Sequence, residues 1–230
     1  MASPPNVGVV VVAAGAGSRA GGGPPKQWRD LAGVPVVLRA LRPFLSHAEV
    51  GSVVLVVPAG VAQAPPEWLS PIIGDRLTLA VGGLERMDSV AAGLAALPAE
   101  MTIVLIHDGA RPFPEPDVID AVIQGARAGS GVIAALPVTD TIKEVEDGRV
   151  VRTVPREGLW RAQTPQGFPR PMLEYAFEQA RANGLKATDD AALVEAAGGT
   201  VLIIPDVTSN LKITTAEDFL VADALLRRTP

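Results

Sequence analysis

A run of β-branched residues that ends in a loop of small residues constrains this chain more than any other segment. Val7–Val12 reads VGVVVV, an Ala-Ala-Gly turn follows, and Arg19 and Lys26 stand further along the loop. Small residues let the backbone approach a ligand closely and leave N–H groups free to point at anionic oxygens. Two permanent cations on such a loop match the needs of a triphosphate. The segment therefore predicts an enzyme that handles nucleotides.

Two common phosphate-binding loops do not fit this segment. Lys26 lies between a proline and a glutamine, whereas the Walker loop requires a glycine before the lysine and a hydroxyl after it. The dinucleotide pattern G-x-G-x-x-G/A is met by Gly15, Gly17 and Ala20, but that pattern must open directly into a helix. The glycines and prolines at 21–25 oppose a helix there. A Gly-rich surface loop with incidental basic residues remains the alternative.

Composition restricts the class of protein. A chain of 230 residues without a long linker predicts one domain, spanning 1–230. The absence of cysteine, a short polar N-terminus and no apolar run of membrane-spanning length favour a cytoplasmic protein without membrane contact. A net charge of −5 argues against a nucleic-acid partner, so the cations that bind anions must be gathered in a local pocket.

Strand-like and helix-like segments alternate along the chain, which predicts an α/β fold, a Rossmann-like, mostly parallel sheet flanked by helices. The expected strands are Val7–Val12, Ser52–Val57, Leu77–Val81, Thr102–His107, Gly131–Val138 and Thr200–Ile204. The expected helices are Val36–Leu45, Met87–Leu97, Pro116–Ala128, Phe168–Ala182, Thr188–Ala197 and Thr215–Arg228.

Residues 139–157 interrupt the alternation. Two strand-like arms surround Asp147-Gly148, a favoured two-residue hairpin turn, and the segment is far more charged than the expected sheet strands. We expect a projecting β-hairpin arm. An edge hairpin blunted by charge and an arm that grips a second subunit explain the segment equally well.

Further chemical side chains follow the expected strands, where a doubly wound fold places its ligands. Asp108 comes directly after a buried strand and could hold magnesium or a substrate hydroxyl, and Arg111 could bind a phosphate. A local ion pair between the two is the alternative. His107 ends the same strand, and we expect it to be structural.

Two more segments carry candidate residues. Gly83 and Ser89 belong to a Gly-Gly turn that leads into a helix; they could contact a flat base, or the turn and a capped helix start could explain them. Lys212 stands between apolar residues just before the last helix, where a solvated edge lysine is the ordinary interpretation.

The order of these motifs resembles one family. AAGxGxR…PKQ, GGxERxDSV, HDxARP, an arm that ends in Arg156, LWRAQTPQ, TDD and NLKIT are similar, in register, to the 2-C-methyl-D-erythritol 4-phosphate cytidylyltransferases of the non-mevalonate isoprenoid pathway. The resemblance covers about Val7 to Leu226. The ribitol-5-phosphate cytidylyltransferases share most of these motifs and are the main alternative.

The resemblance implies a homodimer that uses CTP, a sugar-alcohol phosphate and Mg²⁺ and releases pyrophosphate. It implies nucleotide contacts from Ala13, Ala14, Gly15, Gly17, Arg19, Lys26, Gly83, Ser89 and Asp108. Asp108 is also the candidate metal ligand. It implies contacts to the second substrate from Asp108, Arg111, Thr141, Arg156, Thr164, Thr188 and Lys212. Catalytic roles fall to Arg19, Lys26, Arg156 and Lys212.

Two other classes of protein stay in consideration. A non-catalytic module would bind the nucleotide without releasing pyrophosphate. A nicotinamide-dependent oxidoreductase would need the excluded dinucleotide loop and would have no use for Lys26 or Lys212. The full set of cations disfavours both.

Overall fold

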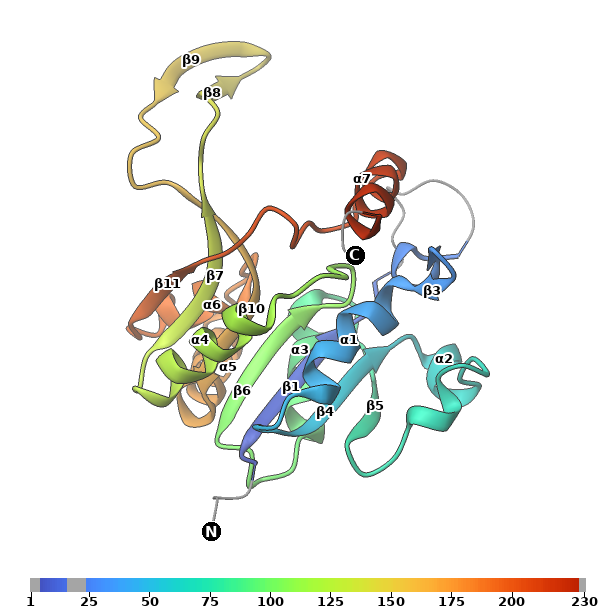
Figure 1. Ribbon diagram of the computed structural model, residues 1–230. Coiled ribbons are helices and arrows are strands. Elements are labelled where there is room, and N and C mark those ends of the chain that lie inside the picture. The colour runs from blue at the N-terminus through green and yellow to red at the C-terminus, as the bar shows by residue number, and fades with distance from the viewer. Residues whose placement is uncertain (1–4, 16–23, 228–230) are drawn as a thin grey trace.

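The structure is a computed structural model that describes residues 5–15 and 24–227. Its centre is a seven-stranded sheet in the order β11-β7-β10-β6-β1-β4-β5 (Figure 1). The strands are β1 (Val7–Val12), β4 (Val50–Val57), β5 (Leu77–Val81), β6 (Ile103–Asp108), β7 (Gly131–Pro137), β10 (Trp160–Pro169) and β11 (Val201–Pro205). β1 and β6 are buried along almost their whole length, which matches the apolar runs Val9–Val12 and Ile103–Ile106 within them.

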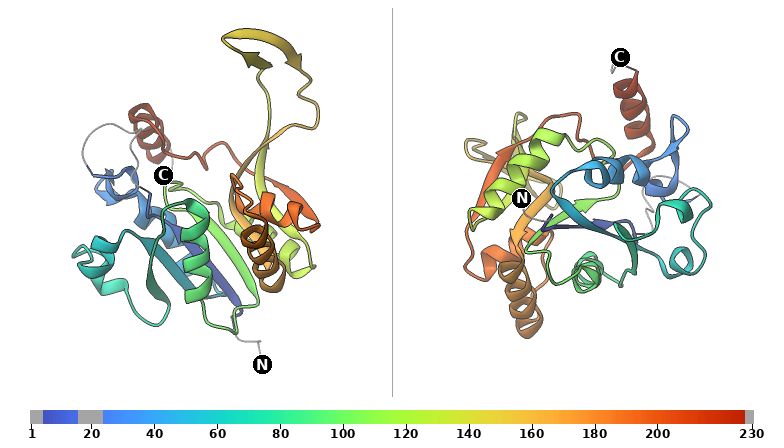
Figure 2. Two further views of the ribbon diagram at one scale, coloured as in Figure 1. Left: turned by 180° about the vertical axis from the view of Figure 1, so that it is seen from behind. Right: turned by 60° about the horizontal axis from the view of Figure 1, so that its bottom comes forward.

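Helices cover both faces of this sheet (Figure 2). The amphipathic helices α1 (Val36–Ser46) and α4 (Pro116–Arg127) bury residues such as Leu41, Phe44 and Ile119 in the core on one face. On the other face α3 (Arg86–Ala96), α5 (Arg170–Asn183) and α6 (Asp190–Ala196) enclose a second core. The predicted α/β class and the flanking helices are confirmed.

One strand of the seven-stranded sheet was missed by the sequence analysis. Residues 160–169 form β10, which pairs antiparallel with both β6 and β7, so the sheet is mixed. The helix expected at Phe168–Ala182 begins later, at Arg170, because Phe168 lies fully buried in the strand. β10 escapes a search for apolar runs because three of its buried side chains are polar: Gln163, Thr164 and Gln166.

The predicted hairpin is confirmed as a separate two-stranded sheet that projects from the body (Figure 1). β8 (Ile142–Glu146) and β9 (Arg149–Val154) pair antiparallel. Asp147 and Gly148 join them with φ of 48° and 77°, as a primed hairpin turn requires. Val145, Val150 and Val151 of the hairpin are more than half exposed, at 52%, 61% and 53%.

A third, small hydrophobic core lies between the last helix and residues 31–36. α7 (Ala216–Leu226) packs on β2 (Asp30–Leu31), which pairs with β3 (Val34–Pro35), and Leu31, Ile213 and Ala222 are buried in this core. The guanidinium of Arg29 also lies 5.1 Å from the centre of the Phe219 ring. This packing brings the segment before α7 close to the one that carries Lys26.

The remaining short elements are the 3-10 turns η2 (Lys26–Trp28) and η3 (Ser70–Ile72) and the helix α2 (Ala59–Gln63), none of which the sequence predicted. No helix in the described part of the chain is long and apolar enough to cross a membrane.

Candidate active site

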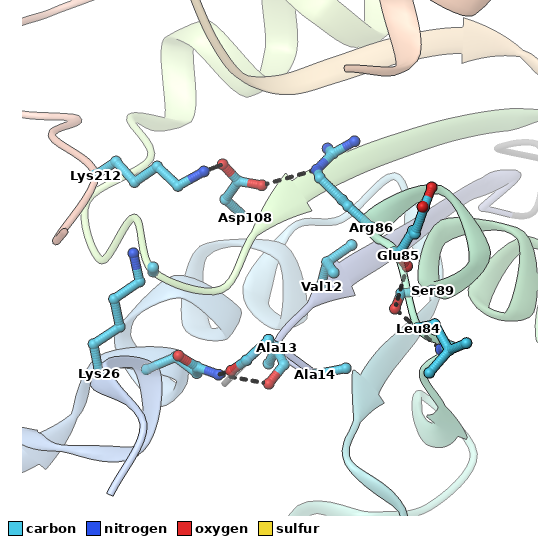
Figure 3. A pocket seen from close by; sticks show the side chains of 14 residues that line it. Val12, Ala13, Ala14, Lys26, Leu84, Glu85, Arg86, Ser89, Asp108 and Lys212 are labelled. Carbon is cyan, nitrogen blue, oxygen red and sulfur yellow. Dashed lines mark hydrogen bonds and ion pairs between the residues drawn. The ribbon is translucent and has the colours of Figure 1, made fainter. Parts of the chain in front are cut away.

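A cleft of about 530 Å³ opens at the carboxyl ends of β1 and β6 (Figure 3). The parallel pairing aligns Val12, the last residue of β1, with Asp108, the last residue of β6, so the two following loops begin side by side. The cleft is lined by Val12, Ala13, Ala14, Gly15, Lys26, Gln27, Gly83, Leu84, Glu85, Arg86, Ser89, Asp108, Ala110 and Lys212. Residues predicted for the site from four separate motifs are therefore brought together.

Asp108 is the centre of charge in this cleft. Its Oδ2 lies 2.8 Å from Lys212 Nζ and 3.7 Å from Arg111 Nε, and its Oδ1 lies 3.5 Å from Arg86 Nε. Burial alone would raise the pKa of Asp108, but the charges of Lys212, Arg86 and Arg111 outweigh it and hold that pKa well below its usual range. The carboxylate is ionised, and the ion pair with Arg111, given above as the alternative interpretation, exists alongside the contact with Lys212.

His107 and Thr164 fix the turn that carries Asp108. The backbone N–H of Asp108 donates to Thr164 Oγ1 (3.0 Å), and Thr164 Oγ1 lies 3.0 Å from His107 Nδ1. Since His107 Nε2 lies 3.0 Å from the carbonyl of Arg111, the proton sits on Nε2 and the threonine hydroxyl donates to Nδ1. Burial lowers the pKa of His107 to about 4, so the ring is neutral. His107 is structural, as expected.

The loop after β1 is held in place by Gln27, whose side chain is buried. Gln27 Nε2 donates to the carbonyl oxygens of Ala13 (2.8 Å) and Gly15 (2.6 Å). The Ala13 N–H donates to the Val56 carbonyl, whereas the N–H groups of Ala14 and Gly15 have no acceptor among the described residues. A Cβ at Gly15 would meet nothing within 4 Å. Because Ala14 and Gly15 line the cleft, these N–H groups are available to an anion there.

The Gly-Gly turn is shaped by its own helix. A Cβ on Gly83 would approach Asp88 Cβ to 2.3 Å, so the glycine is required by packing. Ser89 Oγ accepts from the Gly83 N–H (3.2 Å) and donates to the Glu85 carbonyl (3.2 Å), and Glu85 with Asp88 forms a capping box at the start of α3. The alternative explanation of this turn, a capped helix start, is thus confirmed. Both Gly83 and Ser89 also face the cleft, and base recognition by them stays a prediction.

Arg86 is a site residue that the sequence analysis did not single out. Its Nη2 lies 2.7 Å from Asp190 Oδ2, and its Nε faces Asp108 (Figure 3). Burial lowers the pKa of Arg86, but the charges of Asp190 and Asp108 outweigh that effect and raise it. Asp190 is buried at the first turn of α6. The arginine of GGLER and the second aspartate of TDD were both visible in the motifs, but only the fold pairs them.

Five of the predicted substrate residues lie outside the lining of this cleft. Arg111 and Thr164 are buried behind Asp108. Thr141 is exposed where the hairpin begins, and the exposed Arg156 donates to the Thr139 carbonyl. Thr188 is exposed just before the Asp189 cap of α6. Their roles as substrate contacts stay predictions, as do those of Gly17 and Arg19, which lie outside the described residues.

The cleft offers a limited donor set for a metal. Within residues 5–15 and 24–227 no three His, Cys, Asp or Glu side chains are grouped as metal ligands. Mg²⁺ in nucleotide-binding sites is commonly held by one or two carboxylates together with substrate phosphates. The ionised Asp108 fits that arrangement.

An open loop after β1, converging cations and a carboxylate lie at the carboxyl edge of a Rossmann-like sheet, an arrangement typical of a nucleotidyltransferase-type enzyme. Residues 7–228 match the family model described as IspD, 2-C-methyl-D-erythritol 4-phosphate cytidylyltransferase. The chain belongs to this family.

Individual relatives agree with the family match. The protein of this name from Pelotomaculum thermopropionicum is 45% identical over 224 residues, which cover 96% of this chain and 94% of the relative. The solved structure of the Thermus thermophilus protein of the same name is 33% identical, with a TM-score of 0.80 and coverage of 95% and 98%. The 4-diphosphocytidyl-2C-methyl-D-erythritol synthase from Anaerococcus prevotii superposes with a TM-score of 0.85 at 27% identity, covering 98% of this chain and 100% of that one. The predicted family is confirmed, and the chain is a cytidylyltransferase of isoprenoid biosynthesis.

Proposed function

We propose that this chain transfers CMP from CTP to 2-C-methyl-D-erythritol 4-phosphate, giving 4-diphosphocytidyl-2-C-methyl-D-erythritol and pyrophosphate. The observation that carries the proposal is the arrangement of Lys26, Lys212 and Asp108 around a cleft lined by Ala14 and Gly15, whose N–H groups have no acceptor among the described residues. Lys26 and Lys212 extend into the same space from different elements (Figure 3).

The reaction needs charge neutralisation more than a base. An oxygen of the phosphate monoester forms a bond to the α-phosphorus of CTP, and the bond between that phosphorus and the bridging oxygen of pyrophosphate breaks. The attacking oxygen is already anionic because the second pKa of a phosphate monoester is about 6. His107, the histidine beside Asp108, has both ring nitrogens occupied and is no candidate for a base.

The cleft residues, together with Arg19 from outside the described part of the loop, have separate tasks in this proposed chemistry. Lys26 and Arg19 neutralise the triphosphate and the charge that builds on the α-phosphate, and Lys212 guides the incoming phosphate. Asp108 orients Lys212 and is the residue that would hold Mg²⁺, which supplies further neutralisation of the triphosphate when bound. Gly83 and Ser89 face the space where the base would lie.

The substrate test compares two sugar-alcohol phosphates. Pyrophosphate release is followed with CTP and either methylerythritol phosphate or ribitol 5-phosphate, with ATP, GTP and UTP as controls. We expect release with CTP and methylerythritol phosphate. Pyrophosphate release only with ribitol 5-phosphate would show that ribitol 5-phosphate is the second substrate. CTP binding without any release of pyrophosphate would indicate a non-catalytic binding module.

We further propose a homodimer in which the 139–157 arm of one chain brings Thr141 and Arg156 to the site of the other. The half-exposed valines of β8 and β9 support this, since an arm that stayed in water would gain nothing from them. Arg156 and Lys212 also lie on different elements, and Arg156 does not line the cleft of its own chain.

A mixed-dimer experiment tests the arm. Arg156→Ala and Lys212→Ala are each inactive on this account, but mixing the two leaves one intact site in every hybrid dimer. After subunit exchange we expect about a quarter of wild-type activity, since half of two-fold dimers are hybrids with one good site of two. A mixture that stays inactive after proven exchange would contradict an arm that acts across the dimer.

A further inference from the structure

A second cavity, of about 380 Å³, adjoins the cleft and shares Lys212 with it. β10 contributes Arg161, Ala162 and Gln163 to its wall, and the segment between β11 and α7 contributes Thr208 and Leu211. This segment runs beside β10, since Gln163 Nε2 donates to the Asn210 carbonyl (2.9 Å). The remaining lining residues are Arg111, Leu136 and Asp218.

The cavity carries an excess of positive charge. Three of its lining residues are cations, Arg111, Arg161 and Lys212, and Asp218 is the only acidic residue among them. Asp218 is already engaged at the start of α7, where its Oδ2 accepts from the N–H groups of Thr214 (2.7 Å) and Thr215 (2.8 Å). The cavity wall is therefore suited to an anion rather than to an uncharged polyol.

The three cations differ in what already neutralises them. Lys212 and Arg111 both approach Asp108, and Arg111 also donates to the Asn210 carbonyl (2.8 Å). Arg161 is exposed, and its side chain makes no hydrogen bond or ion pair with any residue in the described ranges. Burial lowers the pKa of Arg111; the charges of Asp108 and Asp206 act in the opposite direction, and those of Arg161 and Arg86 lower the pKa further. Arg161 and Arg111 thus repel each other across the cavity wall, and an anion between them would remove that repulsion.

We propose that Arg161 is a further substrate-binding residue, whose guanidinium binds the phosphate of the second substrate from the side opposite the triphosphate. The inference rests on the proposed function. The phosphate monoester must lie next to the α-phosphate of CTP, hence near Lys212, which borders both cavities. The phosphate is the one charged group of that substrate, carrying about −1.5 to −2 charges near neutral pH, and a guanidinium fork can bind two of its oxygens without hindering the third.

The test separates the two substrates kinetically. Arg161→Ala is compared with Arg161→Lys and with Arg181→Ala, which removes an exposed arginine of α5 away from both cavities. In Arg161→Ala we expect the KM for methylerythritol phosphate to rise about 10- to 100-fold, the range for one charged hydrogen-bonding partner. The KM for CTP should change less than about threefold, Arg161→Lys should recover part of the loss, and Arg181→Ala should behave as wild type.

Inorganic phosphate is the second probe, because it carries the same charged group without the polyol. It should inhibit competitively against the second substrate, and more weakly in Arg161→Ala than in wild type. An unchanged KM for methylerythritol phosphate in Arg161→Ala, or a rise in the KM for CTP instead, would overturn the assignment. A wild-type enzyme that released no pyrophosphate would defeat the proposed function itself, so the two failures are distinguishable.

Discussion

The neutral, buried His107 makes a prediction about stability that follows directly from its contacts. Burial lowers its pKa from 6.5 to about 4 in the folded protein. As the pH falls below 6.5, His107 becomes protonated in the unfolded chain but stays neutral in the folded protein. The free energy of unfolding therefore decreases from about pH 6.5 down to about pH 4. A difference of 2.5 pKa units corresponds to about 3 kcal/mol in total, of which about 2 kcal/mol is lost between pH 7 and pH 5.

Urea unfolding at pH 7 and pH 5 measures this loss. The control is His107→Gln, which cannot take up a proton and should lose about 2 kcal/mol less than wild type over the same interval. Proton NMR of the histidine C2–H resonances, assigned with His47→Gln, gives a second reading: the His107 resonance should not move above pH 5. Parallel pH profiles for the two proteins, or a His107 resonance that titrates near 6.5, would refute the bonding scheme around Asp108.

Three substitutions in the cleft give further expected outcomes. Lys26→Ala should lower kcat about 100-fold or more while circular dichroism stays unchanged, because a cation that meets the triphosphate is lost; a near-normal kcat would exclude this role. Asp108→Asn should lower the free energy of unfolding by about 3–5 kcal/mol, because Lys212 and Arg111 would lose their shared carboxylate. The double variant with Lys212→Met should recover part of this loss. An unchanged melting temperature in Asp108→Asn would contradict the ion-pair geometry. Gln27→Leu should raise the KM for CTP about tenfold, because the carbonyls that shape the loop lose their donor; an unaltered KM would show that the loop does not need Gln27.

The parts of the fold that could be predicted are those with simple periodicity. β1 and the Ile103–Ile106 part of β6 are apolar because both faces of the sheet are covered there, and the Asp147-Gly148 turn has a strong local preference. β10 could not be predicted in this way. Its buried Gln163, Thr164 and Gln166 form hydrogen bonds with partners far away in sequence, which are the Asn210 carbonyl, His107 and Asp189 respectively.

In the candidate site, too, some residues could be predicted from the sequence and others could not. Lys26, Asp108 and Lys212 were predicted from motifs, and parallel strand ends bring them to one edge of the sheet. Arg86 and Asp190 were not, because an ion pair between the first turns of two helices depends on how those helices pack. Arg161 faces a cavity only because β10 runs beside the segment before α7.

The central claim is that this cleft joins a cytidylyl group to a sugar-alcohol phosphate. The most direct measurement is ³¹P NMR of CTP, Mg²⁺ and methylerythritol phosphate before and after addition of the protein. The account predicts that the monoester resonance disappears while two coupled diphosphate resonances and free pyrophosphate grow in equal proportion. A spectrum in which the monoester persists while CTP yields CMP and pyrophosphate would contradict it, since CMP would then have been transferred to water.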